Sequence, residues 1–156
     1  MAQSTTQPAQ TLLAFDVGAR RIGVAVGNTV SASAREVGVL DVFEAGPDWP
    51  ALDRWMKEWR PQRLVVGDPA TLDGGDQPVR RLARSFARQL QQRYRLPVEQ
   101  VDERASSIEA AQRFAAGRAS GSRRRHEASR LDALAAAVIL ERWLAEPDSR
   151  IALPED

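Results

Sequence analysis

The chain has 156 residues, a formal net charge of +1, one histidine and no cysteine. This length favours one domain that buries about two thirds of its unfolded surface, and the lack of cysteine excludes a thiolate nucleophile, a cysteine-ligated zinc site and a disulfide framework. The sequence also contains no apolar run long enough to cross a membrane and no signal-peptide pattern, so we expect a cytoplasmic protein without a membrane partner.

The first part of the chain has the pattern of antiparallel strands. Residues 1–10 are polar and uncharged, and we expect them to form a flexible N-terminal tail. Two apolar runs at residues 11–18 and 21–27 are separated by a short polar turn, which predicts a β-hairpin. Residues 36–43 supply a third strand. The sheet therefore begins with antiparallel pairing.

The next part alternates between helix and strand patterns. Apolar residues at helical spacing predict a helix over residues 49–59, followed by a short apolar strand over residues 63–67. A long amphipathic helix over residues 79–94 and a strand over residues 97–101 come next. Strands joined through helices pair in parallel by right-handed crossovers.

The last part is predicted to be helical. Ser106 and Glu109 have the spacing of a capping box, so a helix is expected to begin there and to end near Gly117. An arginine-rich loop follows, and residues 128–145 form a mostly apolar helix suited to packing on a sheet. We assign residues 146–156 to a C-terminal tail.

These elements predict one α/β domain over residues 11–145, with a mixed central sheet flanked by helices. Its first three strands are antiparallel and its later strands parallel. Neither a dinucleotide-binding glycine pattern nor a Walker loop is present, because Gly18 and Gly23 have the wrong spacing for both.

Three carboxylates occupy positions that a packed fold would otherwise fill with apolar side chains. Asp16 lies in an apolar strand, Glu103 follows another strand, and Asp132 lies on an apolar face of the last helix. Each has a structural interpretation: a turn-forming role for Asp16, an ion pair for Glu103 and a helix-dipole interaction for Asp132. Their joint occurrence favours one shared cation. Oxygen ligands suit Mg²⁺ or Mn²⁺.

Arginine supplies nearly all the positive charge, since Lys57 is the only lysine. A cluster on the second helix is as consistent with a solvated face as with phosphate binding; it comprises Arg80, Arg81, Arg84 and Arg88. The glycine- and serine-rich loop before the last helix carries a better candidate contact for a phosphate backbone, namely Arg123, Arg124 and Arg125. His126, beside that run, is expected to be solvated or to contact phosphate.

Four motifs resemble, in order and spacing, those of the YqgF/RuvX family of pre-16S rRNA nucleases, which are also described as Holliday-junction-resolvase-like proteins. They are DVGARRIGVA at residues 16–25, VVGDP at residues 65–69, VDER at residues 101–104 and LDALAA at residues 131–136. The resemblance spans about residues 11–145. Four ordered motifs are much more specific than any one of them.

The resemblance implies an RNase H-like fold and a metal-dependent nuclease that trims the 5′ end of the 16S rRNA precursor, with ribosomal particles as further partners. By position, Asp16, Glu103 and Asp132 become the catalytic, metal-binding acids. Arg21 and Arg104 match basic positions that hold phosphate, and Asp102 is a weaker candidate acid.

The chain also departs from the family pattern. Asp68 replaces a residue that is commonly hydrophobic, at a strand end where other RNase H-like nucleases place a catalytic acid. It is therefore either an additional metal ligand or a cap of the following turn. Ser106 and Ser107 replace a usual Thr pair and keep the hydroxyl groups.

Several functions remain open at this stage. The leading hypothesis is a two-metal nuclease acting on rRNA precursor. One alternative is a structure-specific endonuclease for branched DNA such as the Holliday junction, which would act most easily as a two-fold homodimer rather than as a monomer. Another is a non-catalytic, nucleic-acid-binding assembly factor whose acids bind a structural ion. Branched or single-stranded DNA is therefore an alternative partner to pre-rRNA. An actin-like ATPase would need a second domain for which the chain is too short.

Overall fold

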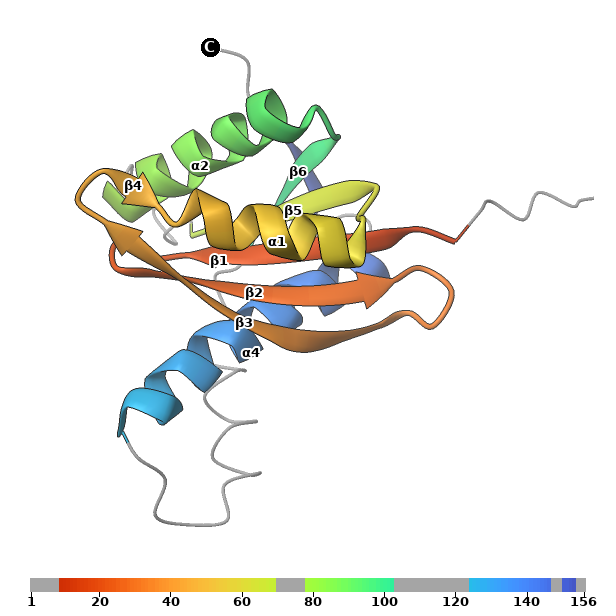
Figure 1. The fold of residues 1–156 in the computed structure, drawn as a ribbon. Coiled ribbons are helices and arrows are strands. Elements are labelled where there is room, and N and C mark those ends of the chain that lie inside the picture. Colours follow the sequence, from red (N-terminus) through yellow and green to blue (C-terminus); the bar gives the residue numbers. More distant parts are fainter. Residues whose placement is uncertain (1–8, 70–77, 103–123, 147–149, 154–156) are drawn as a thin grey trace, which may run out of the picture.

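The computed structural model describes residues 9–69, 78–102, 124–146 and 150–153 (Figure 1). Seven strands of this part of the chain form one sheet, in the order β4-β3-β2-β1-β5-β6-β7. The strands are β1 (Thr11–Val17), β2 (Arg21–Asn28), β3 (Ser33–Phe43), β4 (Gly46–Pro47), β5 (Arg63–Asp68), β6 (Val98–Asp102) and β7 (Arg150–Ala152). The helices are α1 (Trp49–Trp59), α2 (Pro78–Tyr94) and α4 (Arg124–Ala145).

The mixed sheet confirms the predicted fold class. β1 pairs with β2, and β2 with β3, in antiparallel registers, whereas β5 lies parallel to both β1 and β6. Because β1, β5 and β6 run in the same direction, their C-terminal ends lie at one edge of the sheet. Asp16 and Asp68 are therefore at the same edge.

The helices cover the two faces of the sheet. Leu13 and Phe15 of β1 belong to a core that includes α1 and α2, whereas Leu12 and Ala14 belong to a core that includes α4. This alternation follows from the two-residue period of a strand. Figure 1 shows α4 lying on the face of the sheet away from α1.

The structure adds a strand to the region assigned from sequence to the C-terminal tail. β7 pairs antiparallel with β6, and Arg150 stacks on the indole of Trp143, with its guanidinium carbon 3.6 Å from the ring centroid. The Arg150 Nε and Nη2 groups also donate hydrogen bonds to the Trp143 carbonyl. A three-residue strand held by such contacts gives little periodic signal in the sequence. The helix predicted from Ser106 lies outside the described residues.

A polar cluster joins α1 to α2. Arg93 donates two hydrogen bonds to the carboxylate of Asp53, at 3.1 and 2.7 Å, and the Tyr94 hydroxyl donates a third at 2.6 Å. The hydrogen bonds from Arg93 and then Tyr94 lower the pKa of Asp53. Burial, followed by the bond to Asp53, raises the pKa of Tyr94. These contacts fix the relative position of the two helices on their shared face.

None of the described helices is long and apolar enough to cross a membrane.

The Asp53 cluster should make stability sensitive to acid. Because the pKa of Asp53 is lowered in the folded state, its stabilising contribution is present above its ordinary pKa of about 4 and is lost as the pH falls through the lowered value. We expect Asp53→Asn to unfold at a lower temperature than the wild type at pH 7, with the difference shrinking at acidic pH. Thermal unfolding between pH 7 and pH 2.5 measures this, with Glu58→Gln, which removes an exposed carboxylate from the same helix, as the control. A difference that stays constant with pH would contradict the assignment.

Candidate active site

Asp16 lies at the C-terminal end of β1, on the face of the sheet covered by α4. It shares this face with Leu12 and Ala14, which are fully buried, while Asp16 itself is partly exposed. The strand is buried along most of its length, and Asp16 is partly exposed because it lies near the strand end. Asp16 is thus placed where a carboxylate can be both fixed and accessible.

Gly23 is the residue that brings α4 to Asp16. It is the direct partner of Asp16 in the β1–β2 ladder. A Cβ atom at Gly23 would lie 1.9 Å from the carbonyl oxygen of Asp132 and 2.4 Å from its carbonyl carbon, so the helix backbone occupies the space of the missing side chain. Two of the predicted acids, Asp16 and Asp132, are therefore adjacent to the same glycine. No sequence pattern marked Gly23 for this role.

Arg21 also lies in this group. Its Nε donates a hydrogen bond of 2.7 Å to Oδ2 of Asp132, and the two side chains are 42% and 30% exposed. No second partner of Arg21 is recorded among the described residues, so its Nη groups can bind an anion while Nε holds Asp132. This geometry is compatible with the predicted phosphate contact.

Asp68 lies at the same edge of the sheet but on the opposite face. It follows Leu64 and Val66, which pack with α1 and α2, and its side chain is almost completely buried. Arg80 of α2 donates two hydrogen bonds to it, from Nε at 2.9 Å and from an Nη at 3.2 Å. A bidentate pair of this kind compensates the buried charge without a metal ion. Metal ligation by Asp68 stays a prediction, and the contacts favour an anchoring role.

The contact between Asp68 and Arg80 also shows the role of one member of the arginine cluster of α2. At least one member, Arg80, is neither solvated nor available as a simple phosphate contact, since it is only 18% exposed and fixes the end of β5. The sequence could not reveal the pairing, because eleven residues separate the two partners in the chain.

Several predicted site residues lie outside the described part of the chain, namely Glu103, Arg104 and Arg123. Arg124 and Arg125 begin helix α4. β6 ends at Asp102, whose backbone carbonyl accepts a hydrogen bond of 2.8 Å from Arg142. Within the described ranges, no group of three acidic or histidine side chains that could hold a metal ion is present. Of the predicted site residues, the described part of the chain brings Asp16, Asp132 and Arg21 together around Gly23.

Comparison with known proteins places the chain in a family. A family model described as "RuvX: Holliday junction resolvase" matches residues 10–146. The chain belongs to the RuvX family. A relative from Xanthomonas axonopodis pv. citri is 62% identical over 148 residues, covering 95% of this chain and 96% of its own length. Another from Xanthomonas oryzae pv. oryzae is 63% identical over 147 residues, covering 94% and 95%. Both are named "Putative pre-16S rRNA nuclease".

Solved structures confirm the RNase H-like fold. RuvC of Thermus thermophilus in complex with a Holliday junction substrate has a TM-score of 0.51 and 17% identity, covering 91% of this chain and 98% of its own. A second Thermus thermophilus RuvC structure has a TM-score of 0.50 and 16% identity, covering 90% and 98%. The RuvX family match and the names of the relatives support a nuclease function.

Gly23→Ala should disturb the site through the backbone of α4. The added methyl group would overlap the Asp132 carbonyl, so α4 must move away from β2. We expect a loss of at least about 2 kcal/mol in the free energy of unfolding, because backbone atoms cannot rotate aside as a side chain can. Chemical denaturation measures it.

Gly38→Ala is the matched control, since its Cβ would meet only the Trp55 ring, at 3.2 Å. Its loss should be clearly smaller. Equal stability of Gly23→Ala and the wild type would show that β2 and α4 are not in close contact.

Asp68→Asn separates the anchoring role from metal ligation. Removing the negative charge of this buried pair weakens the bidentate contact with Arg80, and we expect a loss of about 2 to 4 kcal/mol in the free energy of unfolding. Glu146→Gln, which disrupts an exposed pair with Arg142, should cost at most about 0.5 kcal/mol. We also expect Mg²⁺ to raise the melting temperature of the wild type and of Asp68→Asn alike. If that rise disappears while stability is unchanged, Asp68 is a metal ligand.

Proposed function

We propose that this RuvX-family chain is a cytoplasmic, metal-dependent nuclease that hydrolyses phosphodiester bonds in the 5′-end maturation of pre-16S rRNA. The observation that carries the proposal is that Asp16 and the backbone of Asp132 both adjoin Gly23, with Arg21 bound to the Asp132 carboxylate. The name given to relatives more than 60% identical supports the substrate.

The donor set fits a hard divalent cation. Asp16 and Asp132 offer carboxylate oxygens at one exposed edge, and the motif resemblance adds Glu103, which follows β6 in sequence. Oxygen ligands of this kind select Mg²⁺ or Mn²⁺. When bound, such ions would help water attack the phosphorus and would neutralise charge on the leaving oxygen.

The residues of the chain contribute positioning and electrostatics. Arg21 can hold a non-bridging phosphate oxygen through its Nη groups while its Nε stays on Asp132. Asp132 in turn orients the guanidinium, and its own position is fixed by the close contact of α4 with Gly23. Holding phosphate and carboxylates in one geometry lowers the entropic part of the barrier.

A second candidate substrate is branched DNA. The RuvX family is described as a Holliday junction resolvase, and a neighbour in fold was solved with a Holliday junction. Resolution of a junction needs two symmetric cuts, which a homodimer makes most easily. The two candidates share the acidic edge and differ in the nucleic acid that reaches it.

Asp16→Asn should abolish cleavage while sparing the fold. The substitution keeps the shape of the side chain but removes its charge, so we expect cleavage of the preferred substrate to fall by at least about 100-fold, which corresponds to about 2.7 kcal/mol of barrier. Glu58→Gln, on the outside of α1, should keep full activity. Circular dichroism and melting temperature verify that both variants fold.

The substrate is decided by comparing a labelled 5′ fragment of pre-16S rRNA with a four-way DNA junction, each in Mg²⁺, Mn²⁺ and EDTA. We expect metal-dependent cutting of the RNA. Preferential paired nicking of the junction would favour the resolvase function. Tight binding without cutting of either substrate would contradict the nuclease proposal and favour an assembly factor that acts with ribosomal particles.

A further inference from the structure

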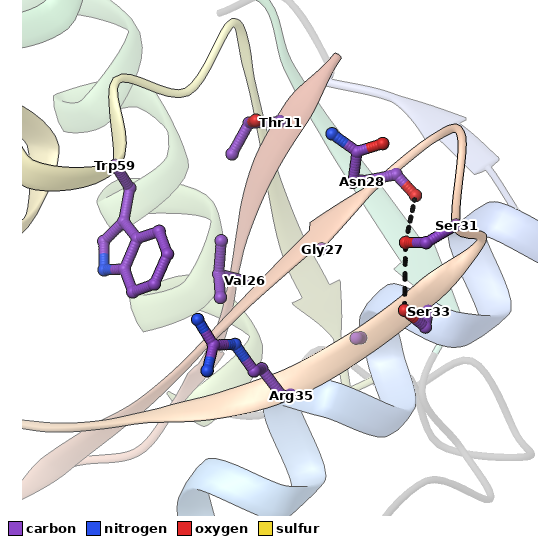
Figure 2. Close-up of a pocket in the computed structure, with 9 residues that line it drawn as sticks. Thr11, Val26, Gly27, Asn28, Ser31, Ser33, Arg35 and Trp59 are labelled. Atoms are coloured by element: carbon purple, nitrogen blue, oxygen red, sulfur yellow. Dashed lines mark hydrogen bonds between the residues drawn. The ribbon is translucent and has the colours of Figure 1, made fainter. Parts of the chain in front are cut away.

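A hollow lies at the other end of the sheet from the acidic edge, which is the edge that carries Asp16 and faces Asp132. It is about 290 Å³ in volume and lies between the end of α1 and the β2–β3 hairpin. Figure 2 shows the side chains that surround it, including Trp59 on one side and Arg35 and Asn28 on others. Thr11, at the start of β1, also lines it. Since Asp16 is five residue steps from Thr11 along an extended strand, the hollow is about 17 Å from the acidic edge.

The charge on the described wall of this hollow is positive, because Arg35 is the one ionisable residue among those that line it. The guanidinium carbon of Arg35 lies 5.1 Å from the centroid of the Trp59 ring, a cation–π contact that holds the side chain at the hollow. No carboxylate lines the hollow, and the described part of the chain provides no ion pair for Arg35. A fixed cation without a counter-charge is suited to an anionic ligand.

Two further donors lie around the same space. The Asn28 side-chain oxygen accepts a hydrogen bond of 2.8 Å from the backbone of Val30, which fixes the orientation of the amide. Figure 2 shows the Asn28 amide nitrogen on the side of Thr11. Among the described residues, neither this nitrogen nor the Thr11 hydroxyl has a recorded acceptor. The hollow therefore presents donors to a ligand rich in acceptors.

The hydroxyl groups of Ser31 and Ser33 in the hairpin donate hydrogen bonds within the turn. Ser33 donates to Ser31 at 3.0 Å, and Ser31 donates to the Asn28 carbonyl at 3.4 Å. These bonds shape the turn beside the hollow (Figure 2). The remaining wall is apolar or flat, formed by Val26, Gly27 and the indole of Trp59.

We propose that this hollow binds one nucleotide, with its phosphate on Arg35, Asn28 and Thr11 and its base against the Trp59–Arg35 pair. Bases stack on indole rings and on guanidinium planes, and arginine binds phosphate. The volume suits one such unit rather than a longer segment. The nucleotide comes either from the free pool or from a single strand, and the chemistry of the contact is the same. The proposal is independent of the reaction at the acidic edge.

Direct binding tests the proposal without reference to cleavage. Isothermal titration of the full chain is made in EDTA with AMP, UMP, inorganic phosphate and a single-stranded RNA pentamer. Arg35→Ala should weaken binding of the nucleotide-bearing ligand by about tenfold or more, because a charge-assisted contact is lost. Arg54→Ala, which removes an exposed arginine of α1 that does not line the hollow, should change it by less than about twofold.

The source of the nucleotide follows from which ligand binds. Arg35-dependent binding of AMP or UMP supports a site for free nucleotides, and Arg35-dependent binding of the pentamer alone supports a site for a strand. In either case the indole N–H signal of Trp59 should shift on binding in an NMR titration. Three results would overturn the proposal. They are binding of inorganic phosphate as tight as that of every nucleotide, an equal loss of ligand affinity in Arg35→Ala and Arg54→Ala, and no binding of any ligand.

Discussion

The close contact between Gly23 and the backbone of α4 is the constraint on which the described site depends. Only a residue without a Cβ atom allows the helix to approach β2 so closely, and Gly23 is the ladder partner of Asp16. The contact therefore determines where Asp132, from the far end of the chain, lies relative to Asp16. Arg21, on the same strand as Gly23, completes the group through its bond to Asp132. One glycine thus sets the geometry of three charged side chains.

The two faces of the sheet carry different groups of charged side chains. The face covered by α4 carries Asp16 and Asp132 at the edge where β1 ends. The other face carries the Asp53–Arg93–Tyr94 cluster and the Asp68–Arg80 pair, which hold α1 and α2 in place. Because side chains alternate between faces, Asp16 and Asp68 reach the same edge from opposite sides. The partly exposed Asp16 is therefore the one proposed to act in the reaction, whereas the buried Asp68 is bound by Arg80, although both are strand-end acids in the sequence.

Local sequence patterns were enough to predict most of the fold. They were not enough to predict contacts between residues that are distant in the chain. Alternation and helical spacing located the β1–β2 hairpin, the parallel strands and the three described helices, because each is determined by neighbouring residues. The apolar surroundings of Asp16 and Asp132, together with the motif resemblance, singled out both residues, and the structure brings both next to one glycine. The sequence did not reveal the role of Gly23, the partner of Asp68 or strand β7, since each depends on a residue distant in the chain. Glu103 lies outside the described residues and stays a prediction.

The central claim is that the edge formed by Asp16, Gly23 and Asp132 holds a divalent cation. The most direct measurement is a titration of the isotope-labelled protein with Mn²⁺, followed by backbone amide NMR, because a paramagnetic ion broadens the signals of nearby nuclei. The account predicts that the amide signals of Asp16, Gly23 and Asp132 broaden first and that added Mg²⁺ restores them. Early broadening centred on Asp68 and Arg80, or uniform weak broadening over the whole chain, would contradict it.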